Sequence, residues 1–260
     1  DKLRNDTVMV FNGDVLSGMD LEGILTTHHD KDADVTMHLL NVADPRAFGC
    51  VPTDSHGRVT AFLEKTEDPP TNQINAGCYV FKRSVIESIP ANRVVSVERE
   101  TFPGLLAEGR LVVGHVDNSY WRDMGRPDDF TRGSSDLVRG IAPSPLIEGK
   151  TGESLVDPSA GIAGGVLLLS GTAVGRGSEV GAGSRLEGTV VFDGVRIEPG
   201  AIIHNSIIAS GAHIGANAVI ENCVIGEGAH IGARCELLDG MRVFPGVSIP
   251  DAGVRFSSDA

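Results

Sequence analysis

The chain has 260 residues, of which 41% are hydrophobic and 22% charged, so we expect one large folded domain or two smaller ones. Its formal net charge is −13, which argues against nucleic acid or an anionic membrane as a partner. No signal peptide or long apolar run is present, and the four cysteines form no Cys-x-x-Cys pair. We therefore expect a cytoplasmic protein with reduced thiols.

Strand and helix patterns alternate through residues 1–140. Strands are predicted at 7–11, 35–42, 75–81 and 111–116, and helices at 20–30, 82–89, 98–108 and after Pro127. A hairpin is predicted between 49–53 and 58–63. The apolar run Val8–Phe11 is typical of a buried parallel strand. This alternation predicts an α/β layered domain.

The composition changes near residue 158. Residues 159–255 hold 19 of the 33 glycines, and only three of the aromatic residues follow residue 158. Pro143, Pro145 and Pro158 mark residues 141–158 as a linker. We predict a second domain over residues 159–255 and a short tail over 256–260.

Aliphatic residues recur with a period of six in this second domain, a period that matches neither a helix nor an ordinary strand. The series is Ile162, Leu168, Val174, Val180, Leu186, Val191, Ile197, Ile202, Ile208, Ile214, Ile220, Ile225, Ile231, Leu237, Val243 and Ile249. It shifts by one residue between 186 and 191, 197 and 202, and 220 and 225. Hexapeptide periodicity predicts a left-handed parallel β-helix in which these residues point inward.

Two aspartates are candidate metal ligands, and the first of them follows a predicted strand end. Asp14 comes directly after Gly13, whose lack of a side chain would let a ligand approach the backbone. Asp123 precedes a glycine turn and a helix that begins with proline. Both carboxylates together would suit Mg²⁺ held against phosphate oxygens. The alternatives are a turn aspartate at Asp14, a helix cap at Asp123, and a core-packing role for Trp121.

Two further segments carry polar groups beside strands. Glu64 could accept hydrogen bonds from sugar hydroxyls and Lys65 could bind a phosphate, although an ordinary exposed pair fits equally well. Asn75 offers both a donor and an acceptor to a vicinal diol, and Gly77 would let a ring lie near the backbone. The alternative at this position is a β-bulge glycine beside a turn asparagine.

The order of these motifs resembles the sugar-1-phosphate nucleotidyltransferases, and among them the mannose-1-phosphate guanylyltransferases of actinobacterial type. The matching stretches are Phe11-Asn-Gly-Asp-Val15, Phe62-Leu-Glu-Lys65, Ile74-Asn-Ala-Gly-Cys-Tyr-Val-Phe81, Val97-Glu-Arg-Glu-Thr-Phe-Pro103 and Trp121-Arg-Asp-Met-Gly-Arg-Pro127. The resemblance implies a Rossmann-like nucleotidyltransferase domain, truncated at its N-terminus, over residues 1–140. It also implies transfer from GTP to mannose 1-phosphate, giving GDP-mannose and diphosphate.

The resemblance also implies roles for single residues. Asp14 and Asp123 would be catalytic residues that hold Mg²⁺, and Lys65 would bind the sugar phosphate. Glu64, Asn75, Gly77 and Gly13 would contact the substrate. The attack on the α-phosphorus would be in line, a reaction that depends on alignment and charge neutralisation.

Two departures from the family pattern bear on these expectations. Glu-Lys-Thr stands where Glu-Lys-Pro is more common, and the glycine-rich nucleotide loop would precede residue 1. Alternatives therefore stay open: a glucose-1-phosphate thymidylyl-, uridylyl- or adenylyltransferase, or a non-catalytic regulatory subunit that binds sugar phosphates. An acyltransferase using His204, His213 or His230 is a weaker alternative. We also expect homo-oligomers formed through the β-helix.

Overall fold

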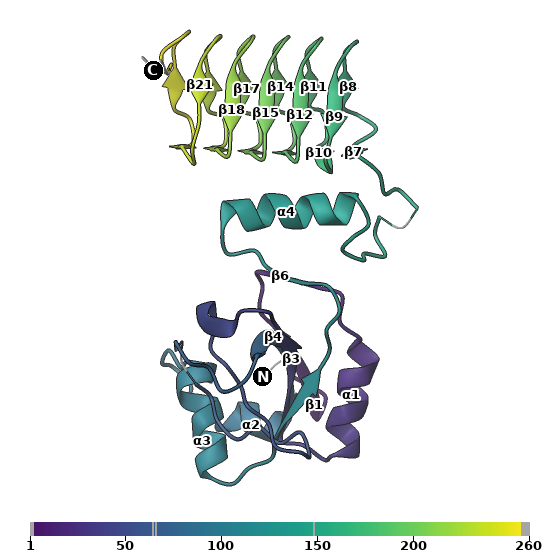
Figure 1. The fold of residues 1–260 in the computed structure, drawn as a ribbon, viewed down its shortest axis with the longest axis vertical. Coiled ribbons are helices and arrows are strands. Elements are labelled where there is room, and N and C mark those ends of the chain that lie inside the picture. Colours follow the sequence, from purple (N-terminus) through teal and green to yellow (C-terminus); the bar gives the residue numbers. More distant parts are fainter. Residues whose placement is uncertain (1–2, 64, 66, 148, 256–260) are drawn as a thin grey trace. The chain divides into compact units, whose positions relative to one another are not determined.

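The computed structural model describes residues 3–63, 65, 67–147 and 149–255. The chain divides between Trp121 and Arg122 into two compact units, called here the α/β unit and the solenoid unit (Figure 1). Within the described residues, no helix is long and apolar enough to cross a membrane.

The α/β unit is built on a four-stranded sheet in the order β1-β4-β3-β5. Its strands are β1 (Thr7–Phe11), β3 (Val35–Asn41), β4 (Gln73–Lys82) and β5 (Val112–Val116). Strands β1 and β3 run antiparallel to β4, and β5 runs parallel to β3. The prediction of a buried parallel β1 is wrong. In the part of the chain that is described, β1 is an antiparallel edge strand, with Val10 and Phe11 38% and 53% exposed.

Helices cover both faces of this sheet (Figure 1). Helix α1 (Leu21–Asp30) packs Ile24 against Cys78 and Val80 of β4. The opposite face carries α2 (Arg83–Ser88) and α3 (Phe102–Ala107). There, Phe102 contacts Tyr79 and Phe81, at ring centroid distances of 5.1 and 6.0 Å. Because successive residues of a strand point to opposite faces, β4 supplies both cores.

The remaining predicted elements of this unit are also present. The π-helical segment η2 (Val97–Thr101) leads directly into α3, so the predicted helix at 98–108 is confirmed, with Pro103 in the first turn of α3. Antiparallel bridges join Cys50 to Leu63 and Thr53 to Val59, which confirms the predicted hairpin. The short elements are η1 (Pro45–Ala47), β2 (Val15–Ser17) and β6 (Trp121–Asp123), and β2 and β6 form a two-stranded sheet.

The solenoid unit is a parallel β-helix with three sheets, which confirms the predicted architecture. The first sheet contains β7 (Ser154–Val156), β10 (Thr172–Val174), β13 (Val190–Val191), β16 (Ile207–Ile208), β19 (Val224–Ile225) and β22 (Arg242–Val243). The second contains β8 (Gly161–Ile162), β11 (Glu179–Val180), β14 (Arg196–Ile197), β17 (His213–Ile214), β20 (His230–Ile231) and β23 (Ser248–Ile249). The third contains β9 (Leu167–Leu169), β12 (Arg185–Glu187), β15 (Ile202–His204), β18 (Val219–Glu221) and β21 (Glu236–Leu237).

Most of the aliphatic series fills the interior of the coils, but Ile162 in the first coil is 39% exposed and the prediction for Ile202 is wrong. Ile203 is fully buried, whereas Ile202 is 38% exposed and points outward. The one-residue shift therefore lies between Ile203 and Ile208, rather than between Ile197 and Ile202. Both isoleucines are equally apolar, so periodicity could not separate them. The pairing register does so, because it aligns Ile203 with the inward-facing Leu186 and Ile220.

Small polar residues turn the corners of the coils. The hydroxyls of Thr172, Ser178, Ser184 and Thr189 are buried, and each donates to a main-chain carbonyl 14 residues later. These bonds satisfy polar groups that would otherwise be costly to bury. They also link each coil to the next.

Helix α4 (Pro127–Val138) belongs to the solenoid unit. Its Phe130 ring stacks on Phe192 at 6.4 Å, and the Ser135 hydroxyl donates to the Ser170 carbonyl at 2.6 Å. Strand β7 starts inside the stretch predicted as linker, because Ser154 already pairs with Thr172. The hydroxyl of Ser135 fits there because Gly171 has no Cβ, which would lie 2.4 Å from its oxygen.

Candidate active site

Polar residues of the α/β unit meet where β1 ends against the middle of β4. The Asn12 main-chain N–H donates to the Gly77 carbonyl at 2.8 Å, so the Asn12-Gly13-Asp14 turn lies beside the Asn75–Gly77 segment. Asp14 is exposed at this position. A Cβ built on Gly13 would meet no atom within 4 Å, so the space above that residue is open.

Gly77 lies in an irregular part of β4. Met37 pairs with Tyr79, but Leu39 pairs with Asn75, so residues 76–78 bulge from the register. The φ of Gly77 is +78°, and a Cβ there would lie 2.9 Å from the side-chain nitrogen of Asn12. The alternative of a bulge glycine is therefore confirmed as a structural role. Its proposed contact with a sugar stays a prediction.

The Asn75 side chain is held by three protein groups. Its amide nitrogen donates to the Tyr79 hydroxyl and to Glu98 Oε1, both at 2.7 Å, and its oxygen accepts from the Gly77 N–H at 3.1 Å. The amide is therefore oriented before any ligand arrives, with one lone pair of its oxygen still open. Burial raises the pKa of the Tyr79 phenol to about 12, and the Glu98 charge acts in the same direction.

Glu98 is a site residue that the sequence analysis did not single out. It lies in η2, 23 residues from Asn75, and its side chain is exposed. The Glu98-Arg-Glu100 segment supports the family resemblance but by itself indicates no partner for Glu98. No spacing rule connects a strand with a π-helical segment from another part of the chain, so the sequence contained no direct signal for this contact.

Lys65 follows a segment that pairs with Cys50. Leu63 and Ile74 both pair antiparallel with Cys50, so these two segments run in the same direction, about 10 Å apart. Lys65 and Asn75 follow those pairs, and Lys65 is exposed. Glu64 lies outside the described residues, so its role stays a prediction.

Trp121 packs beside this region. Its indole N–H donates to the Ala76 carbonyl at 2.9 Å, and its ring meets Phe48 edge-on at 5.9 Å. This contact ties the indole to the bulge, in agreement with the packing role considered for the chain's only tryptophan.

The two predicted magnesium ligands fall in different compact units, so their joint site stays a prediction. Asp123 is exposed, and its Oδ1 accepts from the Gly125 N–H at 2.9 Å. Residue Arg126, not Asp123, occupies the N-cap of α4. Neither Asp14 nor Asp123 forms an ion pair within the described residues. Carboxylate oxygens are ligands that suit Mg²⁺. No cluster of three or more metal-ligating side chains occurs in that part of the chain.

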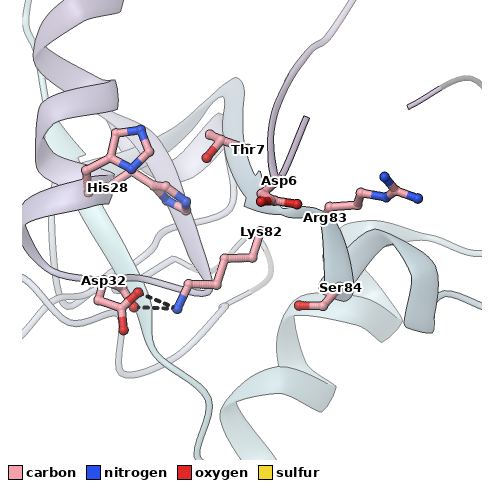
Figure 2. A pocket seen from close by; sticks show the side chains of 8 residues that line it. Asp6, Thr7, His28, Asp32, Lys82, Arg83 and Ser84 are labelled. Carbon is pink, nitrogen blue, oxygen red and sulfur yellow. Dashed lines mark hydrogen bonds and ion pairs between the residues drawn. The ribbon is translucent and has the colours of Figure 1, made fainter. Parts of the chain in front are cut away.

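A surface pocket of about 400 Å³ opens at the other end of the β1–β4 pair (Figure 2). Thr7 pairs with Lys82 there, whereas Phe11 pairs with Cys78 near the bulge. Lys82 Nζ binds the Asp32 carboxylate at 2.7 Å, and Figure 2 shows the two side chains pointing toward one another. This pocket is therefore separate from the predicted substrate residues.

Comparison with known proteins agrees with this fold. Residues 1–140 match the nucleotidyl transferase family, and residues 150–254 match the GMPPB C-terminal domain. The chain therefore belongs to the nucleotidyl transferase family, and the predicted family and fold are confirmed.

Within that family, the chain is similar to proteins named as mannose-1-phosphate guanylyltransferases. It is 65% identical to the Mycobacterium tuberculosis mannose-1-phosphate guanylyltransferase, over 99% of this chain and 72% of that relative. It is 36% identical to mannose-1-phosphate guanylyltransferase 1 of Arabidopsis thaliana, over 72% of this chain. It is 30% identical to a putative mannose-1-phosphate guanyltransferase of Sulfolobus acidocaldarius, over 68% of this chain. The chain spans 54% and 47% of the latter two relatives.

Proposed function

We propose that the protein carrying this chain transfers a guanylyl group from GTP to mannose 1-phosphate, releasing GDP-mannose and diphosphate. The observation that carries this proposal is the 65% identity to the Mycobacterium tuberculosis relative over 99% of the chain. The polar residues gathered at the β4 bulge support it, because they offer hydrogen bonds of the kind that a sugar requires. We place the protein in the cytoplasm, where both substrates would be supplied.

The phosphate end of the reaction is assigned to three residues. Asp14 and Asp123 would hold Mg²⁺, which when bound would offset the negative charge of the reacting phosphates. Lys65 would bind the sugar phosphate through its ammonium group. Attack on the α-phosphate would be in line, so these residues would serve alignment and charge balance rather than act as strong bases.

The sugar end is assigned to the bulge and its neighbours. The open lone pair of the Asn75 oxygen would accept from a sugar hydroxyl, and Gly77 would leave room for the ring. Glu98 binds Asn75 through Oε1, which leaves Oε2 to accept from a second hydroxyl. Glu64 is proposed to contribute a further carboxylate.

The test of this activity is a diphosphate-release assay on the full-length protein. GTP, ATP, UTP and dTTP would each be combined with mannose 1-phosphate and with glucose 1-phosphate. The proposal expects the highest kcat/KM for GTP with mannose 1-phosphate. A preference for glucose 1-phosphate with another nucleotide would replace it with the alternative transferases. No turnover with any pair would favour a regulatory subunit.

The role of Glu98 has its own test in steady-state kinetics. Glu98→Gln should raise the KM for mannose 1-phosphate about tenfold, because a charged hydrogen-bond acceptor is lost, with a smaller change in kcat. Glu100→Gln is the matched control, since Glu100 lies in the same η2 segment but pairs with Arg93 at 2.8 Å. Equal effects of the two substitutions would remove Glu98 from the sugar site.

We also propose that the β-helix assembles the protein into homo-oligomers, because β22 and β23 are edge strands among the described residues and could pair with a second copy. Light scattering coupled to size-exclusion chromatography of the full-length protein measures this directly. A monomeric mass at micromolar concentration would contradict it.

A further inference from the structure

The solenoid unit contains a second pocket, of about 270 Å³, between α4 and one corner of the first coils. The corner wall is formed by Ser170, Gly188 and Asn205, which all have positive φ angles, of 55°, 54° and 45°. Gly188 keeps this wall open, because a Cβ there would lie 2.7 Å from the Asn205 side-chain oxygen. The volume is slightly below the usual range for small-molecule pockets, so it suits a small ligand.

The other wall is a polar stripe of α4. Arg132, Ser135, Asp136 and Arg139 are spaced i, i+3, i+4 and i+7, so they lie on one face of the helix. Arg132 and Arg139 are separated by two turns, about 10 Å along the axis. They can therefore reach the pocket from opposite ends of the stripe.

The residues that line this pocket carry a net positive charge, whereas the chain as a whole is negative. Three arginines line it, whereas Asp136 is the single carboxylate among its described lining residues, in a chain of net charge −13. Arg122 is already paired with Asp136 at 3.1 Å and Asp129 at 3.5 Å. Arg132 and Arg139 are exposed and form no ion pair with any other described residue. Two uncompensated guanidinium groups thus remain at one cavity.

We propose that this pocket binds the phosphoryl group of a small phosphorylated molecule through Arg132 and Arg139. Guanidinium groups match phosphate oxygens in geometry and form charge-assisted hydrogen bonds with them. The Asn205 amide would add a neutral hydrogen bond from the corner of the coil. The site lies wholly within the solenoid unit, and the proposal does not depend on the activity proposed above.

The test is isothermal titration calorimetry on the full-length protein with inorganic phosphate, diphosphate and mannose 1-phosphate as separate probes. The double variant R132Q/R139Q removes both charges. R234Q/R242Q is the matched control, since it removes two charges from exposed arginines on later coils. Circular dichroism of each variant shows that it is folded, and R132K/R139K preserves the charge if the glutamine variant is not.

The expected result is that at least one probe binds R132Q/R139Q about tenfold or more weakly than the wild type, while R234Q/R242Q binds within about twofold. R132K/R139K should fall between them, because lysine keeps the charge but loses the planar fork. Phosphate bound at Lys65 would persist in all these variants, so it is distinguishable. A larger loss of affinity in R132Q/R139Q for mannose 1-phosphate than for inorganic phosphate would show that the sugar also contacts the pocket. Equal affinities of the two double variants, or no binding of any probe, would overturn the proposal.

Discussion

The two units of this chain use the same apolar residue types in different ways. In the solenoid unit, each coil repeats the previous one, so Ile208 stacks on Val191 and under Ile225 at a spacing of 17 residues. In the α/β unit, Asn75 meets Glu98 and Asn12 meets Gly77 without any repeat. The comparison teaches that a contact can be predicted from sequence when it recurs at a fixed spacing. A contact that occurs once must be found in three dimensions.

The units also differ in where their polar groups lie. The solenoid buries hydroxyls at its corners, where each has a carbonyl partner on the next coil. The α/β unit places most of its candidate site residues at exposed strand ends, and its buried His28 and Thr36 pair beneath α1 at 3.0 Å. Substitutions in the solenoid unit should therefore change stability, and substitutions at the strand ends of the α/β unit should change activity.

The largest expected effect is in the solenoid core. Ile203→Ala should lower the free energy of unfolding by about 3 to 4 kcal/mol, because it leaves a cavity among fully buried neighbours. Ile202→Ala, one residue away but 38% exposed, should cost less than about 1 kcal/mol. Urea denaturation of both variants measures the difference. Equal losses would contradict the register described for β15.

The next largest expected effect is on catalysis, and it concerns the two proposed magnesium ligands. Asp14→Asn and Asp123→Asn should each lower kcat/KM of the full-length protein about a hundredfold or more, equivalent to about 2.7 kcal/mol, with little change in melting temperature. Asp30→Asn, at the exposed end of α1, is the control. Turnover that is undiminished by either substitution would remove both residues from the metal site.

A somewhat smaller effect follows from the buried imidazole under α1. Burial, followed by the charges of His29 and Lys82, lowers the pKa of His28 to about 4, from 6.5. The unfolded chain therefore binds a proton that the folded chain excludes between these pH values. Stability should fall by about 2 to 3 kcal/mol as the pH drops from about 6.5 to about 4.

Denaturation midpoints over that pH range check this linkage. His28→Gln should flatten the pH dependence while keeping a hydrogen bond to Thr36, and His56→Gln, at an exposed turn, should leave it unchanged. Parallel profiles for wild type and His28→Gln would show that another group is responsible.

The smallest expected effect compares two glycines of the candidate site. Gly77→Ala should lower the free energy of unfolding by about 1 to 2 kcal/mol. Alanine is strained at a φ of +78°, and its Cβ would lie too close to the Asn12 side chain. Gly13→Ala should cost less than about 0.5 kcal/mol, since its surroundings are open. Thermal unfolding of the two variants measures this difference. Similar losses of stability would contradict the expectation that a side chain at residue 77 strains the bulge.

Much of the fold was predictable because local patterns agreed with it. The prolines at Pro103 and Pro127 each occupy the first turn of a helix, and Asp20 caps α1 as an aspartate before a helix should. The direction of β1 was not predictable. An apolar run of four residues suits a parallel or an antiparallel strand equally well, and only its pairing with β4 decides between them.

The sequence by itself determined the hexapeptide coils, the alternation of strands and helices, and the polar residue types near the ends of the strands, because each depends on residues close together in the chain or on a fixed repeat. Tertiary structure alone decided that Ile203 rather than Ile202 enters the core, that Glu98 orients Asn75, and that Arg132 and Arg139 share a pocket with Asn205. Those outcomes depend on register and on packing between distant segments, where the position of one element is set by the shape of another.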